Sequence, residues 1–165
     1  MTDRLLQVRR EAHLASKRQQ RTVGAVVKIP LDAKHHTYGQ ILPEADVAVF
    51  DSRSIHDLSP IEVVSSPVLF RVAVYNHAIT RGRWPKVGAA PLRHEFQKPA
   101  VKFMQDPIKP TEFSIYCGGE IRRASRADCK GLERCAVWEP EHVEDRIRDH
   151  YRGVPNKWLQ SLQIR

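Results

Sequence analysis

The sequence predicts one α+β domain, in which a strongly curved antiparallel sheet or small barrel carries an N-terminal helical arm and a C-terminal helix. Several short segments between residues 23 and 117 alternate apolar and polar side chains, as strands with one buried face do. Their short connections favour antiparallel pairing. A segment with helical spacing follows after residue 140. The 165 residues, 41% hydrophobic and 28% charged, suit a single globular domain over residues 1–165.

The first 22 residues are expected to form a basic helical arm before an α+β core that covers residues 23–165. The apolar side chains of this arm fall at helical spacings of three and four: Leu5, Val8, Ala12 and Ala15. Residues 1–28 hold seven Lys or Arg against two acids, so five of the eight net positive charges lie there. We interpret this charge as a solvated helix face in preference to a phosphate-binding arm, because no nucleic-acid-binding motif accompanies it.

The alternating segments predict strands at residues 23–29, 37–42, 47–50, 63–64, 68–75 and 112–117. Pro30 ends the first strand, because proline cannot donate a ladder hydrogen bond. The segment at 68–75 is largely apolar on both faces, which indicates a strand that is largely buried on both sides. Gly118 and Gly119 are expected to make the turn after the last strand.

The region between Ala78 and Pro110 is predicted to be a long loop over the sheet, because it holds many backbone breakers: Gly82, Pro85, Gly88, Pro91, Pro99, Pro107 and Pro110. Loops of this length often carry function. The clearest helix is expected to begin at Pro140, whose ring is preorganised for the first helical turn, and to end at Gly153.

Several classes of protein and cofactor are excluded by what the sequence lacks. No stretch approaches the ~20 apolar residues of a membrane span, and the N-terminus has no continuous apolar signal core. We therefore expect a cytoplasmic protein without membrane contact. The cysteines Cys117, Cys129 and Cys135 form no disulfide or zinc pattern and are expected to be reduced. No phosphate-binding glycine motif is present, so we expect no nucleotide cofactor.

A divalent metal stays an alternative, but the histidines form no ligand motif. The densest candidate is the predicted helix HVEDRIRDHY, which contains His142, Asp145, Asp149 and His150. At 100° per residue, His150 points to the apolar side and the two aspartates to the opposite side, so they cannot share one ion. We therefore interpret this segment as a solvated helix with one histidine near the core.

A thiol nucleophile is the other route to catalysis. Cys117 precedes Gly118 and Gly119, whose main-chain N–H groups could stabilise an oxyanion. However, Cys117 is expected on the same face of the strand as Phe113 and Ile115, and a cysteine buried among apolar side chains is inert. The strand pattern therefore favours a structural thiol over a nucleophile.

Two long runs carry a resemblance to a known family. The run VVKIPLDAKHHTYGQI at residues 26–41, followed by VAVFDSR, resembles the opening of the bacterial family known as immunity protein twenty-six or the HocA phosphotriesterase family. The similarity continues through Trp84 and Gly88 and then through GLERCAVWEPEHVEDRI. It therefore covers most of the chain after residue 22.

The resemblance implies two different activities. The immunity name implies a small cytoplasmic protein that binds and blocks a toxin, whereas the HocA name implies hydrolysis of organophosphate triesters. We predict the phosphotriesterase, because the size and the continuous similarity match the HocA-like branch. A toxin-immunity or binding protein without physiological catalysis is the alternative, and a nucleic-acid binder through the basic arm is a second one.

In a hydrolase, an activated water or thiolate would attack phosphorus while basic side chains stabilise the phosphoryl oxygen. The ionisable candidates for catalysis lie in or beside irregular segments: Cys117, His77, Glu120 and Glu133. The candidates for substrate binding are Trp84, Arg122 and Trp138, with core packing as the alternative for both tryptophans. Metal ligands stay unassigned. The expected ligand is an organophosphate triester, the alternative partner is a protein toxin, and the chain is expected to be monomeric.

Overall fold

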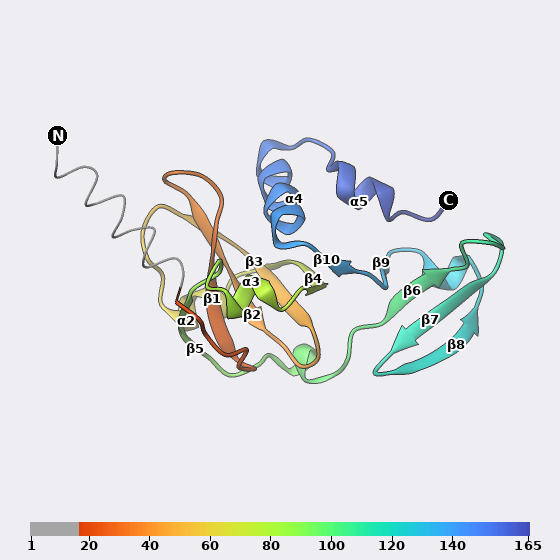
Figure 1. The fold of residues 1–165 in the computed structure, drawn as a ribbon, viewed down its shortest axis with the longest axis horizontal. Helices are drawn as coiled ribbons and strands as arrows, with labels where there is room; N and C mark the ends of the chain where they lie inside the picture. The colour runs from red at the N-terminus through yellow and green to blue at the C-terminus, as the bar shows by residue number, and fades with distance from the viewer. Residues whose placement is uncertain (1–16) are drawn as a thin grey trace.

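The computed structural model describes residues 17–165 and places their strands in two sheets, with the main helix over the larger one (Figure 1). The larger sheet, sheet A, contains β1 (Ala25–Pro30), β2 (His36–Ile41), β3 (Asp46–Ser54), β4 (Val68–Val74), β5 (Lys86–Ala89) and β10 (Val137–Trp138). The smaller one, sheet B, contains β6 (Lys102–Gln105), β7 (Phe113–Cys117), β8 (Glu120–Ala124) and β9 (Glu133–Arg134).

Sheet A has the strand order β10-β4-β3-β2-β1-β5. Its pairs are antiparallel except the short pair of β10 with β4, which is parallel. Within the described chain the sheet is open and ends at β10 and β5, so the predicted small barrel is wrong. The barrel does not close because β6 to β9 pair with one another in sheet B, and the one later strand, the two-residue β10, returns only to the edge beside β4.

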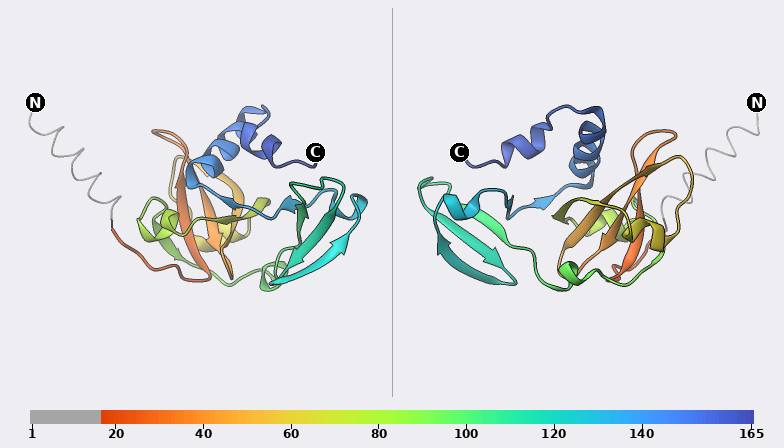
Figure 2. Two further views of the ribbon diagram at one scale, coloured as in Figure 1. Left: turned by 45° about the vertical axis from the view of Figure 1, so that its right-hand side comes forward. Right: turned by 180° about the vertical axis from the view of Figure 1, so that it is seen from behind.

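Sheet B has the order β8-β7-β6-β9, and its β6–β7 and β7–β8 pairs are antiparallel. The predicted turn at Gly118 and Gly119 connects β7 to β8, and both glycines adopt positive φ angles, 56° and 86°. Two successive positive φ angles define the hairpin turn whose twist matches that of the strands. Figure 2 shows the two sheets side by side, joined by the chain from β5 to β6 and by the chain from β9 to β10.

The predicted strands near residues 23–29, 37–42, 47–50, 68–75 and 112–117 correspond to β1, β2, β3, β4 and β7. The predicted C-terminal helix corresponds to α4 (Pro140–Arg152), which ends at Gly153 in the left-handed conformation. A short helix, α5 (Lys157–Ser161), follows and was not predicted. None of the helices described here is both long and apolar enough to cross a bilayer.

Three other expectations are corrected. The predicted strand at residues 63–64 belongs to helix α2 (Pro60–Val64), because Ser59 and Glu62 form a capping box and Pro60 starts the helix. The predicted long loop from 78 to 110 contains α3 (His77–Thr80), β5, the 3-10 helix η1 (His94–Gln97) and β6. Its prolines lie between these elements instead of interrupting them.

The predicted N-terminal arm falls mostly outside the described residues, which begin at 17. Residues 17–22 form no helix. They run beside α3 and β5, where the Gln19 side chain donates hydrogen bonds to the carbonyl oxygens of Ile79 and Trp84 at 2.9 and 2.8 Å. This stretch is therefore held beside α3 and the start of β5 by hydrogen bonds of the Gln19 side chain.

Both faces of sheet A are covered. One face packs against α4 through Val143 and Ile147, and the other packs against α2 and η1 through Val63 and Phe96. Sheet B has a smaller core of its own on one face, made by Phe103, Phe113, Ile115 and Cys129. Cys129 belongs to the 3-10 helix η2 (Ala127–Cys129).

A buried ion cluster connects the two sheets. Asp46, at the start of β3, accepts a hydrogen bond from Arg71 Nε in sheet A at 2.9 Å and one from Lys102 Nζ in sheet B at 2.6 Å. The side chains of Asp46 and Lys102 are 5% and 8% exposed. Arg21 adds a bond from Nη2 to the Asp46 carbonyl oxygen at 2.8 Å. The carboxylate therefore holds cations from both sheets.

The chain from β9 to β10 makes a second connection. Two residues, Cys135 and Ala136, separate β9 in sheet B from β10 in sheet A. Arg146 of α4 binds Glu133 of β9 at 2.6 Å and lies over the rings of Phe70 and Trp138, 3.8 and 5.1 Å from their centroids. One α4 side chain therefore contacts residues of both sheets.

Replacing Asp46 by alanine is expected to lower the free energy of unfolding by about 3–5 kcal/mol, because it leaves a buried ammonium without its acceptor. Urea unfolding followed by circular dichroism measures this loss. The control is Glu112→Ala, which removes exposed ion pairs and is expected to cost about 1 kcal/mol or less. Equal losses for the two variants would contradict the structural role given to Asp46.

Candidate interaction surface

The predicted catalytic residues are spread over three parts of the structure. Cys117 and Glu120 face each other across the β7–β8 hairpin. His77 begins α3, and Glu133 lies in β9, where Arg146 binds its carboxylate. The structure therefore brings together one pair of the four, Cys117 with Glu120.

The buried thiol is Cys129, not Cys117. Cys117 is half-buried at the last position of β7, and its Sγ lies 3.9 Å from the Pro99 carbonyl oxygen. Strand parity predicted a buried Cys117, but the core beneath sheet B ends before this position. Cys129 is 1% exposed, and burial raises the pKa of its thiol. The sequence offered no periodicity around Cys129 that could have shown this.

Both tryptophans predicted to bind substrate lie in the core of sheet A. Trp84 is 0% exposed and donates its Nε1–H to Glu144 Oε1 at 2.9 Å, and Trp138 is 4% exposed. Arg83 binds the same carboxylate with two hydrogen bonds of 2.8 Å. Arg122, the third predicted residue, is exposed on β8. The three residues therefore do not line one site.

Sequence reasoning missed a cluster that could hold a divalent ion. The ligand atoms of His77, Glu139 and Glu141 lie within 4.8 Å of one another, with His77 Nε2 3.4 Å from a Glu139 oxygen. Arg83 lies 3.0 Å from Glu141, and its charge opposes a cation there. Because His77 is about 60 positions from the two acids in the chain, no local spacing could reveal the cluster.

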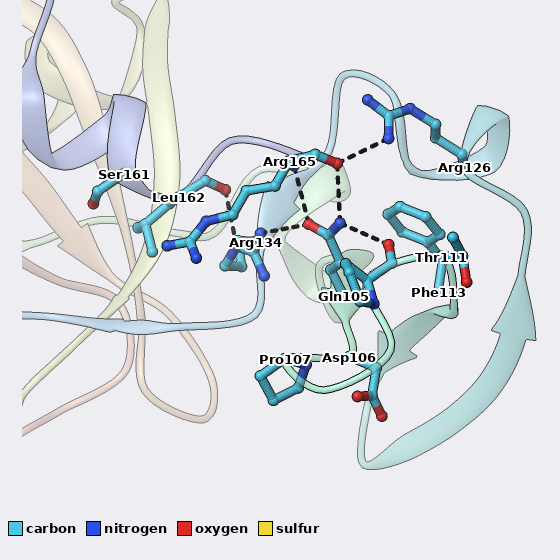
Figure 3. Close-up of a pocket in the computed structure, with 11 residues that line it drawn as sticks. Gln105, Asp106, Pro107, Thr111, Phe113, Arg126, Arg134, Ser161, Leu162 and Arg165 are labelled. Atoms are coloured by element: carbon cyan, nitrogen blue, oxygen red, sulfur yellow. Dashed lines mark hydrogen bonds between the residues drawn. The ribbon is translucent and has the colours of Figure 1, made fainter.

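A cavity of about 690 Å³ lies between sheet B and the C-terminal segment (Figure 3). Three of its lining side chains are guanidinium groups, those of Arg126, Arg134 and Arg165. Arg134 donates to the Leu162 carbonyl oxygen and to Gln105 Oε1, at 2.9 and 3.1 Å. Burial and the charge of Arg165 lower the pKa of Arg134. The lining of the cavity is therefore rich in basic groups.

The outer strand of sheet B forms an exposed basic surface beside this cavity. Four of the five residues of β8 are exposed, and the fifth is half-buried. Ile121 is 61% exposed, and the Arg123 side chain is 85% exposed. Arg123 has a long contact of 3.9 Å with Glu112. An exposed pair at this distance contributes little, so the guanidinium stays available to a partner.

Comparison with known proteins identifies the family. The model of the family described as immunity protein 26 matches residues 22–114, more than half of the chain. The chain belongs to the immunity protein 26 family. A search of curated proteins and a search of solved structures found no match.

The immunity protein 26 match begins just before β1 and ends at the second residue of β7. It includes Asp46, Arg71 and Lys102, so the ion cluster that joins the sheets lies inside it. Strand β8, the β9–β10 connection and helix α4 lie beyond it. The match therefore covers most of sheet A and the beginning of sheet B.

This family assignment overturns the predicted phosphotriesterase function. The matched family is one of immunity proteins, and no comparison supports HocA, organophosphate degradation or a triester substrate. The phosphotriesterase prediction depended on one of the two names of the resembling family, the HocA name. The other name, which implies a protein toxin as partner, is the one that the family match supports.

The three thiols are expected to react with iodoacetamide at different rates. Cys129 should react at least about tenfold more slowly than Cys117 and Cys135, because it is buried and its pKa is raised. Peptide mass spectrometry after timed quenching at pH 8 measures the rates, and the urea-unfolded chain serves as control. Labelling of Cys129 in the folded chain as fast as Cys117 would contradict the structure of sheet B.

Proposed function

We propose that this chain is an immunity protein that binds a cognate protein toxin in the cytoplasm and blocks it by occupying its surface. The observation that carries this proposal is the match of residues 22–114 to the immunity protein 26 family. We also propose that residues 1–165 act as one domain and as a monomer. Neutralisation by binding needs a stable complementary surface, and it needs no catalytic constellation.

The charge of the chain indicates the kind of toxin surface that it would bind. The net charge is +8 at pH 7, and exposed arginines line β8 and the cavity in Figure 3. Opposite charge on a partner accelerates association and disfavours wrong partners, while like charges across an interface repel. An acidic toxin surface is therefore the expected complement.

The architecture supports a role in recognition. Sheet A is covered on both faces, and sheet B is anchored to it through Asp46 and through the β9–β10 connection. A binding surface on such a support loses little freedom when a partner binds, and this favours affinity. The rigid scaffold and the exposed basic strand together fit a protein that acts through a preformed interface.

Co-expression with the toxin encoded beside this gene is expected to restore growth to cells that the toxin alone arrests. Isothermal titration calorimetry with the purified, catalytically inactivated toxin should show a one-to-one complex. The affinity should be nanomolar or tighter, about 12 kcal/mol or more of binding free energy. It should weaken as salt rises, because screening reduces attraction between opposite charges.

A toxin encoded elsewhere is the specificity control, and a random-sequence DNA duplex controls for attraction of a basic chain to phosphates. Continued growth arrest despite verified expression of the folded chain, together with no measurable complex, would contradict the immunity function.

A further inference from the structure

The hairpin geometry leaves the outer edge of β8 free to pair with another strand. In a two-residue hairpin the two residues that flank the turn, here Cys117 and Glu120, exchange main-chain hydrogen bonds. Along the strands, hydrogen-bonded pairs then alternate with pairs whose main-chain groups point away from the partner strand. The main-chain groups of Arg122 therefore point to β7, whereas those of Ile121 and Arg123 point outward. β8 is the last strand of sheet B, and no residue of the described chain bonds to these outward groups.

We propose that the outer edge of β8 is the toxin-binding edge, and that an acidic extended segment of the toxin adds to it as a further strand of sheet B. This inference rests on the proposed immunity function. Strand addition supplies main-chain hydrogen bonds for affinity and side-chain positions for specificity. Here the outward N–H and C=O groups of Ile121 and Arg123 offer four such bonds.

The charges around β8 favour an acidic occupant. Residues 120–130 carry four basic side chains, Arg122, Arg123, Arg126 and Lys130, against two acids, Glu120 and Asp128. The Arg123 side chain is 85% exposed, and its one ion pair in the described chain is the long contact with Glu112. The segment therefore keeps an excess of positive charge that an acidic strand would complement.

The same charges disfavour a second copy of this chain. If two β8 strands paired antiparallel about a two-fold axis at their centre, Arg122 would lie opposite its own equivalent. Like charges directly opposite each other destabilise a strand pair. Charged side chains on an edge strand commonly prevent such self-association. Pairing with the β8 edge of a second copy is therefore disfavoured, whereas pairing with a strand that carries carboxylates is not.

The side chains on the two faces of β8 specify the pattern of the partner strand. Ile121 lies beside Tyr116 of β7, and Met104 is exposed on β6 of the same face. An apolar residue of the partner would pack there. Arg123 on this face and Arg122 on the other would each meet a carboxylate. The occupant is therefore an extended segment that combines one apolar residue with acids on both faces.

The edge strands of sheet A are less suited to this role. Along β5, the main-chain N–H of Lys86 already donates to Gln19 Oε1 at 3.0 Å, and the Lys86 side chain donates to the Gln20 carbonyl oxygen at 3.0 Å. Residues 19 and 20 therefore occupy part of this edge. At the other end, β10 is two residues long and offers little length for pairing.

A proline at position 123 tests the inference on the full chain. Arg123→Pro removes an outward N–H and fills the space of an added strand, but leaves the bonds between β7 and β8 in place. It should weaken binding of the inactivated neighbouring-gene toxin at least about 30-fold. Arg123→Ala keeps the N–H and should weaken binding only about three- to tenfold. Ala89→Pro places an outward proline on β5 and should leave the affinity unchanged.

Thermal unfolding checks that Arg123→Pro remains folded. Should it not, the charge reversal Arg122→Glu with Arg123→Glu leaves the backbone intact and should slow association at low salt about tenfold or more. The immunity function itself fails if the wild-type chain does not bind the toxin. The strand-addition inference alone fails if the wild type binds and the folded Arg123→Pro or the charge-reversed chain binds equally well, or if Ala89→Pro is the variant that loses binding.

Discussion

One carboxylate, that of Asp46, accepts hydrogen bonds from cations on both sheets, and the relative position of the sheets depends on it. A buried carboxylate and a buried ammonium are each costly to remove from water, and each is tolerated because the other is in contact. Arg71 satisfies the second carboxylate oxygen and so fixes its orientation. Among residues 17–165, the Lys102 ammonium has its acceptor only at this carboxylate, so β6 and the strands paired with it are held in one place against sheet A.

The ion cluster and the proposed toxin-binding edge belong to different parts of the chain. Asp46, Arg71 and Lys102 lie inside the region that matches the immunity protein 26 family, whereas β8 lies beyond it. In the proposed account, the matched region supplies the scaffold, and the toxin-binding edge lies on a strand outside that region.

The local features of the fold could be read from the sequence. Alternation located β1 to β4 and β7, and the proline and glycine at its ends located α4. Residues 63–64 were wrongly predicted as a strand, because two adjacent valines show neither helical nor strand periodicity. The capping box formed by Ser59 and Glu62 is the local feature that indicates a helix there. The way the two sheets are joined could not be read from the sequence, because it depends on the contact between Asp46 and Lys102, 56 positions apart.

The site was harder to predict than the fold. The resemblance named the correct family, but its second name directed the search to nucleophiles and histidines. The exposed β8 edge has no motif, since an unpaired strand edge is a property of the sheet order and not of the residues. Arg122 was singled out for its charge, and the structure places it on this edge.

Amide hydrogen exchange of the chain, free and bound to its inactivated toxin, tests most directly the claim that this immunity protein binds through β8. The amides of Ile121 and Arg123 point outward and should exchange rapidly in the free chain, then at least about tenfold more slowly in the complex. The amide of Arg122, which points to β7, should change less. A complex that protects another surface while Ile121 and Arg123 exchange as in the free chain would contradict this account.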